Sequence, residues 1–241
     1  MAILIVQNSP EGPGLLEDIL CQHNIEYNII DLEQGDDFPD PREYEAVVVL
    51  GGPDSANDQT PKMQRELSRI KEILDADIPY LGLCLGMQAL AKAAGGEVYQ
   101  SPVPEVGWRD PDGHPYTLRL TSAGRSDQLF SNVPSSFSVF QLHGETVRLA
   151  ENIRLLAVGN PVEHQVIKVG AAAYGLQAHM ELTPEMFECW RTQDSGLRIL
   201  NQWQLQKDYG IMRAAHESNG RELFTNFLRI AKVLDAKPTN F

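Results

Sequence analysis

The 241-residue sequence is short of cysteine, of positive charge and of long apolar runs, and each shortage excludes a class of protein. Its three cysteines, Cys21, Cys84 and Cys189, are too few and too widely spaced for a disulfide framework or a zinc site of paired CxxC motifs. Its 20 basic residues stand against 33 acidic ones, a net charge of −13, so it offers no basic track for nucleic-acid phosphates. The expected partners are therefore small molecules or other proteins.

Targeting and membrane segments are also absent from the sequence. The N-terminal stretch MAILIVQNSPEG has no basic region before its short apolar run, unlike a signal peptide, and no apolar stretch is long enough to cross a bilayer. We therefore expect a cytoplasmic protein, in a reducing compartment where a lone cysteine stays a thiol. The length suits one large domain over residues 1–241, with a helical C-terminal extension from about residue 185, and the oligomeric state is left open.

The first 96 residues alternate between apolar strands and amphipathic helices. Strands are predicted at residues 2–7, 26–32, 44–50 and 78–84, and helices at residues 15–24, 61–74 and 85–96. Strands that are apolar throughout are typical of a parallel sheet covered on both faces. We therefore predict an α/β fold: an open, mostly parallel central sheet flanked by helices, of the flavodoxin-like kind.

The middle of the chain has a different pattern. Short strands are predicted at residues 97–100, 116–121, 137–149, 153–159, 164–170 and 172–181, with little helix between them. They either extend the sheet or form a smaller antiparallel region. Helices return at residues 184–193, 195–209 and 221–234.

The stretch Gly82-Leu83-Cys84-Leu85-Gly86 lies between a predicted strand and a predicted helix. A nucleophile on such a tight turn is presented at the end of the strand, and the helix N-terminus behind it favours a thiolate. Alternatively, Cys84 is a buried core cysteine and the two glycines serve close packing. The motif by itself leaves both readings open.

Two further features follow predicted strands. His179 and Glu181 are two residues apart on a strand, so they point to the same face, as a base and its orienting carboxylate would; alternatively they are an exposed polar pair. Gly51-Gly52-Pro53 ends another strand, where the N–H of Gly52 and that of Leu85 could form an oxyanion hole; alternatively it is an ordinary turn. Ligands of open α/β sheets bind at the carboxyl ends of strands. Together with Cys84, these features predict a cysteine-nucleophile site.

The motifs GGP (residues 51–53), GLCLGMQ (residues 82–88) and GLQAHME (residues 175–181) resemble the three signatures of class I glutamine amidotransferases. These are the triad-type glutaminase domains of GMP synthetase, anthranilate synthase and carbamoyl phosphate synthetase. EVGW (residues 105–108) and QLHGET (residues 141–146) resemble segments of the stand-alone, GMP-synthetase-like members. Ala178 and Met180 depart from the family, which usually has an aromatic residue and a proline there.

The resemblance implies a catalytic triad and a reaction. Cys84 would attack the side-chain amide of glutamine or of a γ-glutamyl compound and form a thioester. His179 would move the protons, Glu181 would orient His179, and the N–H groups of Gly52 and Leu85 would hold the oxyanion. The substrate is thus a small molecule.

The resemblance also implies a substrate-binding set and a choice of partners. Gln88 and the backbone of Gly144 and Glu145 would hold the amino-acid end, and His143 would line the pocket. No metal or organic cofactor is implied. The chain is then either a free-standing hydrolase or a glutaminase subunit that delivers ammonia to a synthetase partner; a third reading is a binding or regulatory module on the same fold.

The other histidines, cysteines and tryptophans have no such pattern. We expect surface positions for His114, His164 and His216, packing roles for Cys21 and Cys189, and core or pocket-wall positions for Trp108, Trp190 and Trp203.

Overall fold

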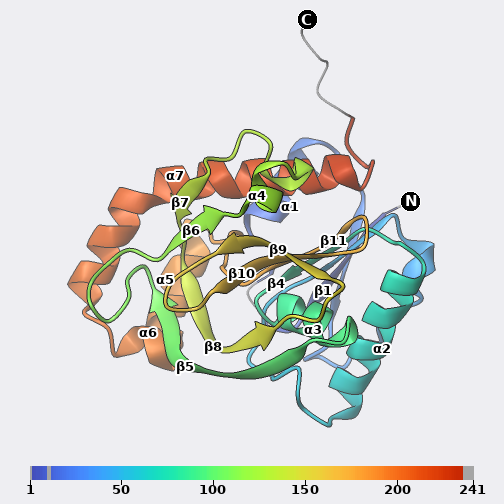
Figure 1. Cartoon of the computed structure of the whole chain (residues 1–241), viewed down its shortest axis with the longest axis horizontal. Coiled ribbons are helices and arrows are strands. Elements are labelled where there is room, and N and C mark those ends of the chain that lie inside the picture. The colour runs from blue at the N-terminus through green and yellow to red at the C-terminus, as the bar shows by residue number, and fades with distance from the viewer. Residues whose placement is uncertain (1, 10–11, 236–241) are drawn as a thin grey trace, which may run out of the picture.

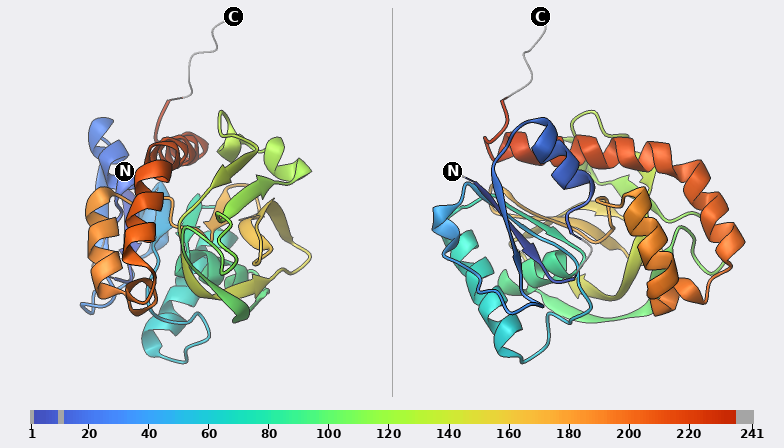
Figure 2. Two further views of the ribbon diagram at one scale, coloured as in Figure 1. Left: turned by 90° about the vertical axis from the view of Figure 1, so that its left-hand side faces the viewer. Right: turned by 180° about the vertical axis from the view of Figure 1, so that it is seen from behind.

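The computed structural model describes residues 2–9 and 12–235, and its centre is a nine-stranded sheet covered by helices on both faces (Figures 1 and 2). The strand order is β2-β1-β3-β4-β11-β10-β9-β6-β7, and the first five strands run parallel to one another. Their bounds are Tyr27–Asp31, Ile3–Gln7, Ala46–Val49, Tyr80–Leu83 and Ala173–Leu176. The predicted α/β class is confirmed, and the carboxyl ends of these five strands meet at one edge.

The middle region both extends the sheet and adds a small one. The strands β10 (His164–Val169), β9 (Ile153–Val158), β6 (Thr117–Leu120) and β7 (Ser136–Ser138) continue the sheet in antiparallel pairs. The strands β5 (Glu97–Gly107) and β8 (Gln141–Arg148) form a separate antiparallel pair. The single strand predicted at residues 137–149 is therefore wrong, because β7 and β8 pair with different neighbours.

Two pairs of helices cover the parallel half of the sheet. One face carries α1 (Leu15–Gln22) and α7 (Gln202–Ile230), and the other carries α2 (Pro61–Asp75) and α3 (Leu85–Ala93) (Figure 2). The remaining helices are η1 (Pro41–Glu43), α4 (Ser122–Arg125), η2 (Gln128–Phe130), α5 (Pro184–Gln193) and α6 (Ser195–Arg198).

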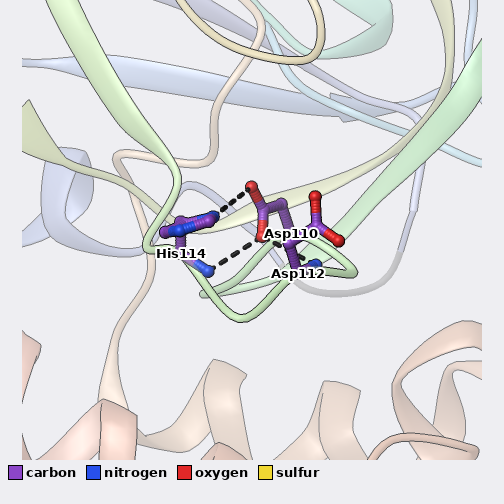
Figure 3. Close-up of side chains that lie close together, drawn as sticks. All are labelled: Asp110, Asp112 and His114. Carbon is purple, nitrogen blue, oxygen red and sulfur yellow. Dashed lines mark hydrogen bonds and ion pairs between the residues drawn. The ribbon is translucent and has the colours of Figure 1, made fainter.

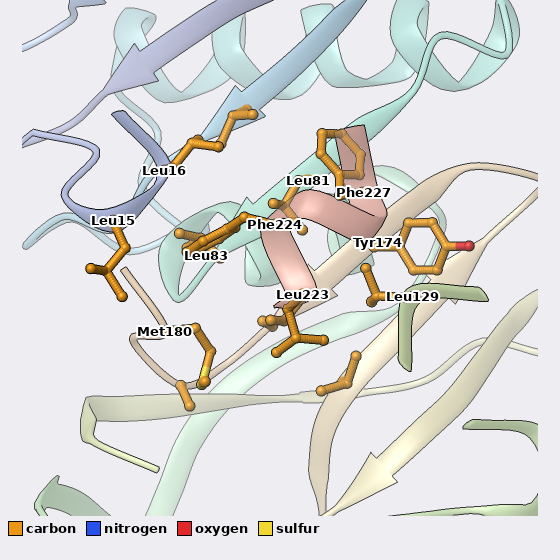
Figure 4. Packing of buried hydrophobic residues seen from close by; sticks show 14 of the residues in the cluster. Leu15, Leu16, Leu81, Leu83, Leu129, Tyr174, Met180, Leu223, Phe224 and Phe227 are labelled. Atoms are coloured by element: carbon orange, nitrogen blue, oxygen red, sulfur yellow. The ribbon is translucent and has the colours of Figure 1, made fainter. Parts of the chain in front are cut away.

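The apolar strands are buried on both faces, as expected for a doubly covered sheet. In β1, Ile3 and Ile5 join the core cluster under α1 and α7, while Leu4 and Val6 join the cluster under α2 and α3. Figure 4 shows the first cluster, where Phe224 and Phe227 of α7 lie beside leucines of β4.

Helix α7 differs most from the prediction. The sequence predicts helices at residues 195–209 and 221–234, but α7 runs unbroken through Gly210 and Gly220. A glycine costs a helix only about 1 kcal/mol, which packing on the core outweighs. Although α7 has 29 residues, neither it nor another helix of the described residues is long and apolar enough to cross a membrane.

Candidate active site

Cys84 lies on the turn between β4 and α3, where it is the N-cap residue of α3. Its φ angle is 50°, which is uncommon for a residue with a side chain, and its N–H donates to the Leu176 carbonyl at 2.8 Å. A side chain at Gly82 would clash with the backbone of Gly86, and one at Gly86 would clash with the Val49 carbonyl. The glycines therefore permit a turn that sets the thiol at the carboxyl edge of the sheet.

His179 and Glu181 lie in the loop after β11, which ends at Leu176, so the prediction that they share a strand is wrong. Their alternation nevertheless survives. Ala178 and Met180 are fully buried in the core cluster under α7, whereas His179 and Glu181 line a cavity on the other side. His179 Nδ1 donates to Glu181 Oε1 at 2.6 Å. The two positions that depart from the family pattern thus face the core rather than the cavity.

The backbone of this loop leaves the sheet because other elements take its hydrogen bonds. The His179 N–H donates to the Phe140 carbonyl at 3.0 Å, and the Glu181 carbonyl accepts from the Leu15 N–H at 2.9 Å. The His179 carbonyl lies 3.0 Å from His216 Nε2. Loops and helices from three parts of the chain therefore fix this segment.

His216 is fully buried, which corrects its predicted surface position. Burial lowers the pKa of His216 to about 4, so the ring is neutral at pH 7 and Nε2–H donates to the His179 carbonyl. Trp108 packs edge-to-face against the imidazole of His216, with the two ring centroids 5.1 Å apart. The helical spacing of His216, Gly220 and Phe224 was the signal for this buried face of α7.

Cys84 and His179 converge on Gly51. A Cβ on Gly51 would lie 3.0 Å from His179 Cε1 and 3.4 Å from Cys84 Cβ. His179 Nε2 is buried and has no hydrogen-bond partner among the described residues, so this nitrogen is available to exchange a proton. Burial lowers the pKa of His179, but the charges of Glu181 and Cys84 and hydrogen bonding outweigh it and raise that pKa well above its usual value.

The backbone donors predicted for the oxyanion hole are free. Neither Gly52 N–H nor Leu85 N–H has a hydrogen-bond partner within the described part of the chain. Leu85 is the first residue of α3, so its N–H is one of the donors that a helix start leaves unpaired. Gly52 lies against Asn8, since a Cβ on Gly52 would be 2.6 Å from Asn8 Cβ.

Gln88 and Gln177 connect Cys84 to the β8 strand. Gln88 Nε2 donates to the Glu145 carbonyl at 3.1 Å and to Gln177 Oε1 at 3.3 Å, and Gln177 Nε2 lies 3.7 Å from Cys84 Sγ. His143 lies on the same strand, with Nδ1 3.0 Å from the Glu145 carbonyl oxygen. Gln177 is fully buried and was missed by the sequence reasoning, although it belongs to the motif at residues 175–181.

All the predicted site residues line one cavity of about 700 Å³. Its lining includes Cys84, Leu85, Gln88, His143, Gly144, Glu145, His179, Glu181 and Gly52. It also includes Trp190, as expected for a core or pocket-wall position, and residues that the sequence reasoning missed, among them Asn8 and Asp194. Asn8 directly follows β1, so the rule about strand ends could have found it; Asp194 carries no such signal.

A cluster of two aspartates and one histidine, residue types that can bind metal ions, lies outside the cavity. Asp110, Asp112 and His114 offer side-chain atoms within 4.8 Å of one another (Figure 3). Asp110 Oδ1 accepts from the backbone N–H groups of Asp112 at 3.0 Å and His114 at 2.8 Å. These turn hydrogen bonds account for the proximity.

The predicted burial of the other histidines, cysteines and tryptophans is confirmed at some positions and wrong at others. The imidazole of His114 is exposed and Trp108 is buried, as expected. Cys21 is exposed rather than packed, and Trp203 is 67% exposed, because both lie on the solvent side of their helices.

Comparison with known families now adds to this geometry. The family model for class I glutamine amidotransferases matches residues 15–193. The chain belongs to this family.

One curated relative of this chain is the glutamine amidotransferase-like protein YfeJ of Salmonella typhimurium, 32% identical over 155 residues that span 62% of each chain. Another is a glutamine-hydrolysing GMP synthase subunit of Methanococcus aeolicus, 28% identical over 80% of this chain and 77% of that one. The aligned part is thus less than two thirds of YfeJ.

Solved structures agree with the fold of the amidotransferase family. A glutamine amidotransferase from Thermotoga maritima is 28% identical, with a TM-score of 0.81 over 96% of this chain and 98% of that one. A glutamine amidotransferase from Methylobacillus flagellatus has a TM-score of 0.84 over 95% and 94% of the two chains; at 22% identity it supports the fold alone.

Proposed function

We propose that this amidotransferase hydrolyses the side-chain amide of glutamine or of a γ-glutamyl compound through a thioester on Cys84, releasing ammonia or an amine. One observation carries the proposal. A thiol on a strained turn, a buried His179–Glu181 pair at 2.6 Å and the free N–H groups of Gly52 and Leu85 line the same cavity. These are the parts that nucleophilic acyl transfer needs.

The proposed reaction has two halves. Cys84 Sγ attacks the amide carbon while His179 takes the thiol proton, and the carbonyl oxygen becomes an oxyanion held by the two N–H groups. The carbon–nitrogen bond then breaks, His179 gives its proton to the leaving nitrogen, and a γ-glutamyl thioester remains. Water activated by His179 hydrolyses the thioester to glutamate and restores the thiol.

The electrostatics of the site support this order of proton transfers. The raised pKa of His179 means that the imidazole holds a proton firmly once it has taken it from the thiol, and Glu181 stabilises the imidazolium. In this proposal the two backbone donors stabilise the negative charge that develops on the carbonyl oxygen, and loss of one such donor typically lowers kcat by about 10²–10³-fold.

The test is hydrolysis by the purified chain of glutamine, which yields glutamate and ammonia, and of γ-glutamyl methylamide, which yields glutamate and methylamine. We expect turnover that Cys84→Ala abolishes and Cys189→Ala preserves, since Cys189 is half-buried and outside the cavity lining. A glutamine-like electrophile should add its mass to the wild type but not to Cys84→Ala. Turnover that survives Cys84→Ala would refute the thioester route.

A second candidate function is delivery of ammonia to a separate synthetase, which the similarity to the GMP synthase subunit of Methanococcus aeolicus favours. Under this reading glutamine hydrolysis by the chain alone is slow, and adding a synthetase with its ATP and acceptor substrate raises it. A chain that is neither labelled nor stimulated would instead be a binding or regulatory module.

A further inference from the structure

The charges around the cavity distinguish between classes of γ-glutamyl substrate. The described lining contains five carboxylates and neither Lys nor Arg; the acids are Glu33, Asp54, Glu145, Glu181 and Asp194. The volume of about 700 Å³ lies within the range of pockets for drug-sized ligands, so the cavity has room for a group beyond the glutamyl residue.

Few of these acids are neutralised by basic groups. Glu181 pairs with His179, and Lys62, which is not part of the described lining, forms ion pairs with both Glu33 and Asp54. One lysine for two carboxylates leaves one negative charge at that wall. The cavity therefore keeps an uncompensated negative charge there.

The two other carboxylates have neutral partners. Glu145 accepts from the Ser55 hydroxyl at 2.8 Å and from Gln100 Nε2 at 3.0 Å. Asp194 Oδ1 accepts from the Leu197 N–H at 2.8 Å. Such bonds hold a carboxylate in place without cancelling its charge, so both remain attractive to a cation.

One wall of the cavity is built by α5 and the residue after it. Trp190 packs edge-to-face on His179 with ring centroids 4.9 Å apart, and His179 is the residue proposed to protonate the leaving nitrogen. Asp194 directly follows α5 and lines the same cavity. An indole and a carboxylate on the wall of one cavity are a combination that stabilises an ammonium ion.

Asn8 gives a second observation that does not depend on charge. It lines the cavity and is fully buried, and its Nδ2 donates to Glu66 at 3.2 Å. Its Oδ1 has no hydrogen-bond partner among residues 2–9 and 12–235. A buried acceptor without a partner costs free energy that an N–H donor of a ligand would recover.

We infer that the leaving group of the natural γ-glutamyl substrate is a cationic amine, so that the substrate is a γ-glutamyl amide of a diamine or polyamine. This inference rests on the proposed function. The amide carbon–nitrogen bond breaks, the nitrogen takes the proton of His179, and the freed amine departs with its distal ammonium, while water converts the thioester to glutamate. An amino acid as leaving group would bring a carboxylate into the same acidic cavity.

The experiment compares kcat/KM for three substrates by glutamate release: γ-glutamylputrescine, which is cationic, γ-glutamyl methylamide, which is neutral, and γ-glutamylglycine, which is anionic. We expect that order of preference, with the cationic amide about tenfold or more above the anionic one, and a ratio that shrinks as salt rises. Asp194→Asn should reduce the ratio while still capping α6. Glu185→Gln removes an exposed acid from α5 outside the cavity lining and should leave the ratio unchanged.

The outcomes separate this inference from the proposed function. Equal rates for the three amides, or a preference for the anionic one, would overturn the inference while leaving the hydrolase intact. A ratio that Glu185→Gln lowers as much as Asp194→Asn would also overturn it, because the preference would then come from overall charge. Failure to hydrolyse glutamine and all three amides would refute the proposed function and the inference with it.

Discussion

Helix α7 packs closely against the His179 segment at Gly220 but not at Gly210. Alanine substitutions at these two glycines are therefore expected to change the stability of the protein in opposite directions. A Cβ on Gly220 would clash with the Met180 carbonyl oxygen, well inside the 3.0 Å below which Cβ atoms are essentially never found. That oxygen is backbone and cannot rotate away, so helix and loop must separate by several tenths of an ångström. A Cβ on Gly210, ten residues earlier, would meet nothing within 4 Å.

The magnitudes follow from general costs. Alanine in place of glycine inside a helix gains about 0.5–1 kcal/mol, which in a chain of this size raises Tm by about 1–4 °C for Gly210→Ala. At Gly220 overpacking costs about 1–3 kcal/mol, with the upper part of the range expected against backbone, so Gly220→Ala should lower Tm by several degrees. Because Met180 lies between His179 and Glu181, we expect a tenfold to hundredfold fall in kcat for Gly220→Ala and none for Gly210→Ala.

Thermal unfolding followed by circular dichroism measures the first effect, and hydrolysis of γ-glutamyl methylamide measures the second. If Gly220→Ala were as stable as Gly210→Ala and kept the wild-type rate, α7 would not position the triad, and the reasoning would be wrong. A loss of stability without loss of rate would show that the loop follows the helix without moving the His179–Glu181 pair.

Three further predictions concern the triad, a buried acid and the turn. Glu181→Gln removes a charge that raises the pKa of His179, so the alkaline limb of the pH–rate profile should move to lower pH and kcat should fall about 10²-fold or more; an unmoved limb would contradict this. Burial raises the pKa of Glu66 from 4.5 to about 7, so the folded state binds the proton more tightly, and this stabilisation is full below pH 4.5 and lost as pH rises through 7. Urea unfolding should show that the wild type loses about 3 kcal/mol of unfolding free energy as pH rises from 4.5 through 7, and that Glu66→Gln does not. If the unfolding free energies of the two proteins changed with pH in parallel, the raised pKa of Glu66 would be wrong. Gly82→Ala would clash with the backbone of Gly86, so it should yield little folded protein, and a normal yield would disprove the close packing of the turn.

The sequence predicts best where one local rule decides the structure. Apolar strands between amphipathic helices imply a doubly covered sheet, and Gly82 and Gly86 around Cys84 imply a tight turn, because each signal lies within a few residues. The rule failed for His179 and Glu181: alternation was read as a strand, but the backbone bonds of this segment go to Phe140 and to helices that no local pattern connects to it.

Residues brought in from distant parts of the chain were missed for the same reason. His216 follows β11 by some forty residues in sequence and was expected on the surface, yet it donates to the His179 carbonyl. Asn8 contacts Gly52 because β1 and β3 pair in parallel, which brings the residues that follow the two strands side by side. Such neighbours follow from tertiary packing, which overrides local propensity, and a single sequence carries little trace of it.

The way in which the His179 segment is held bears on which parts of the chain the chemistry needs. The family model ends at residue 193, whereas His216 and Gly220 belong to α7, which begins at Gln202. These two residues contact the carbonyl groups of His179 and Met180, which lie between the two members of the His179–Glu181 pair. The elements that the family model covers therefore carry Cys84 and the pair, and α7 fixes the loop that holds the pair. Trp190 and Asp194 lie at the same junction, on the cavity wall that the leaving group would meet. Under the proposed function and the inference drawn from it, the helical C-terminal segment combines two tasks, orientation of the base and selection of the leaving group, and changes in it should alter rate and specificity together.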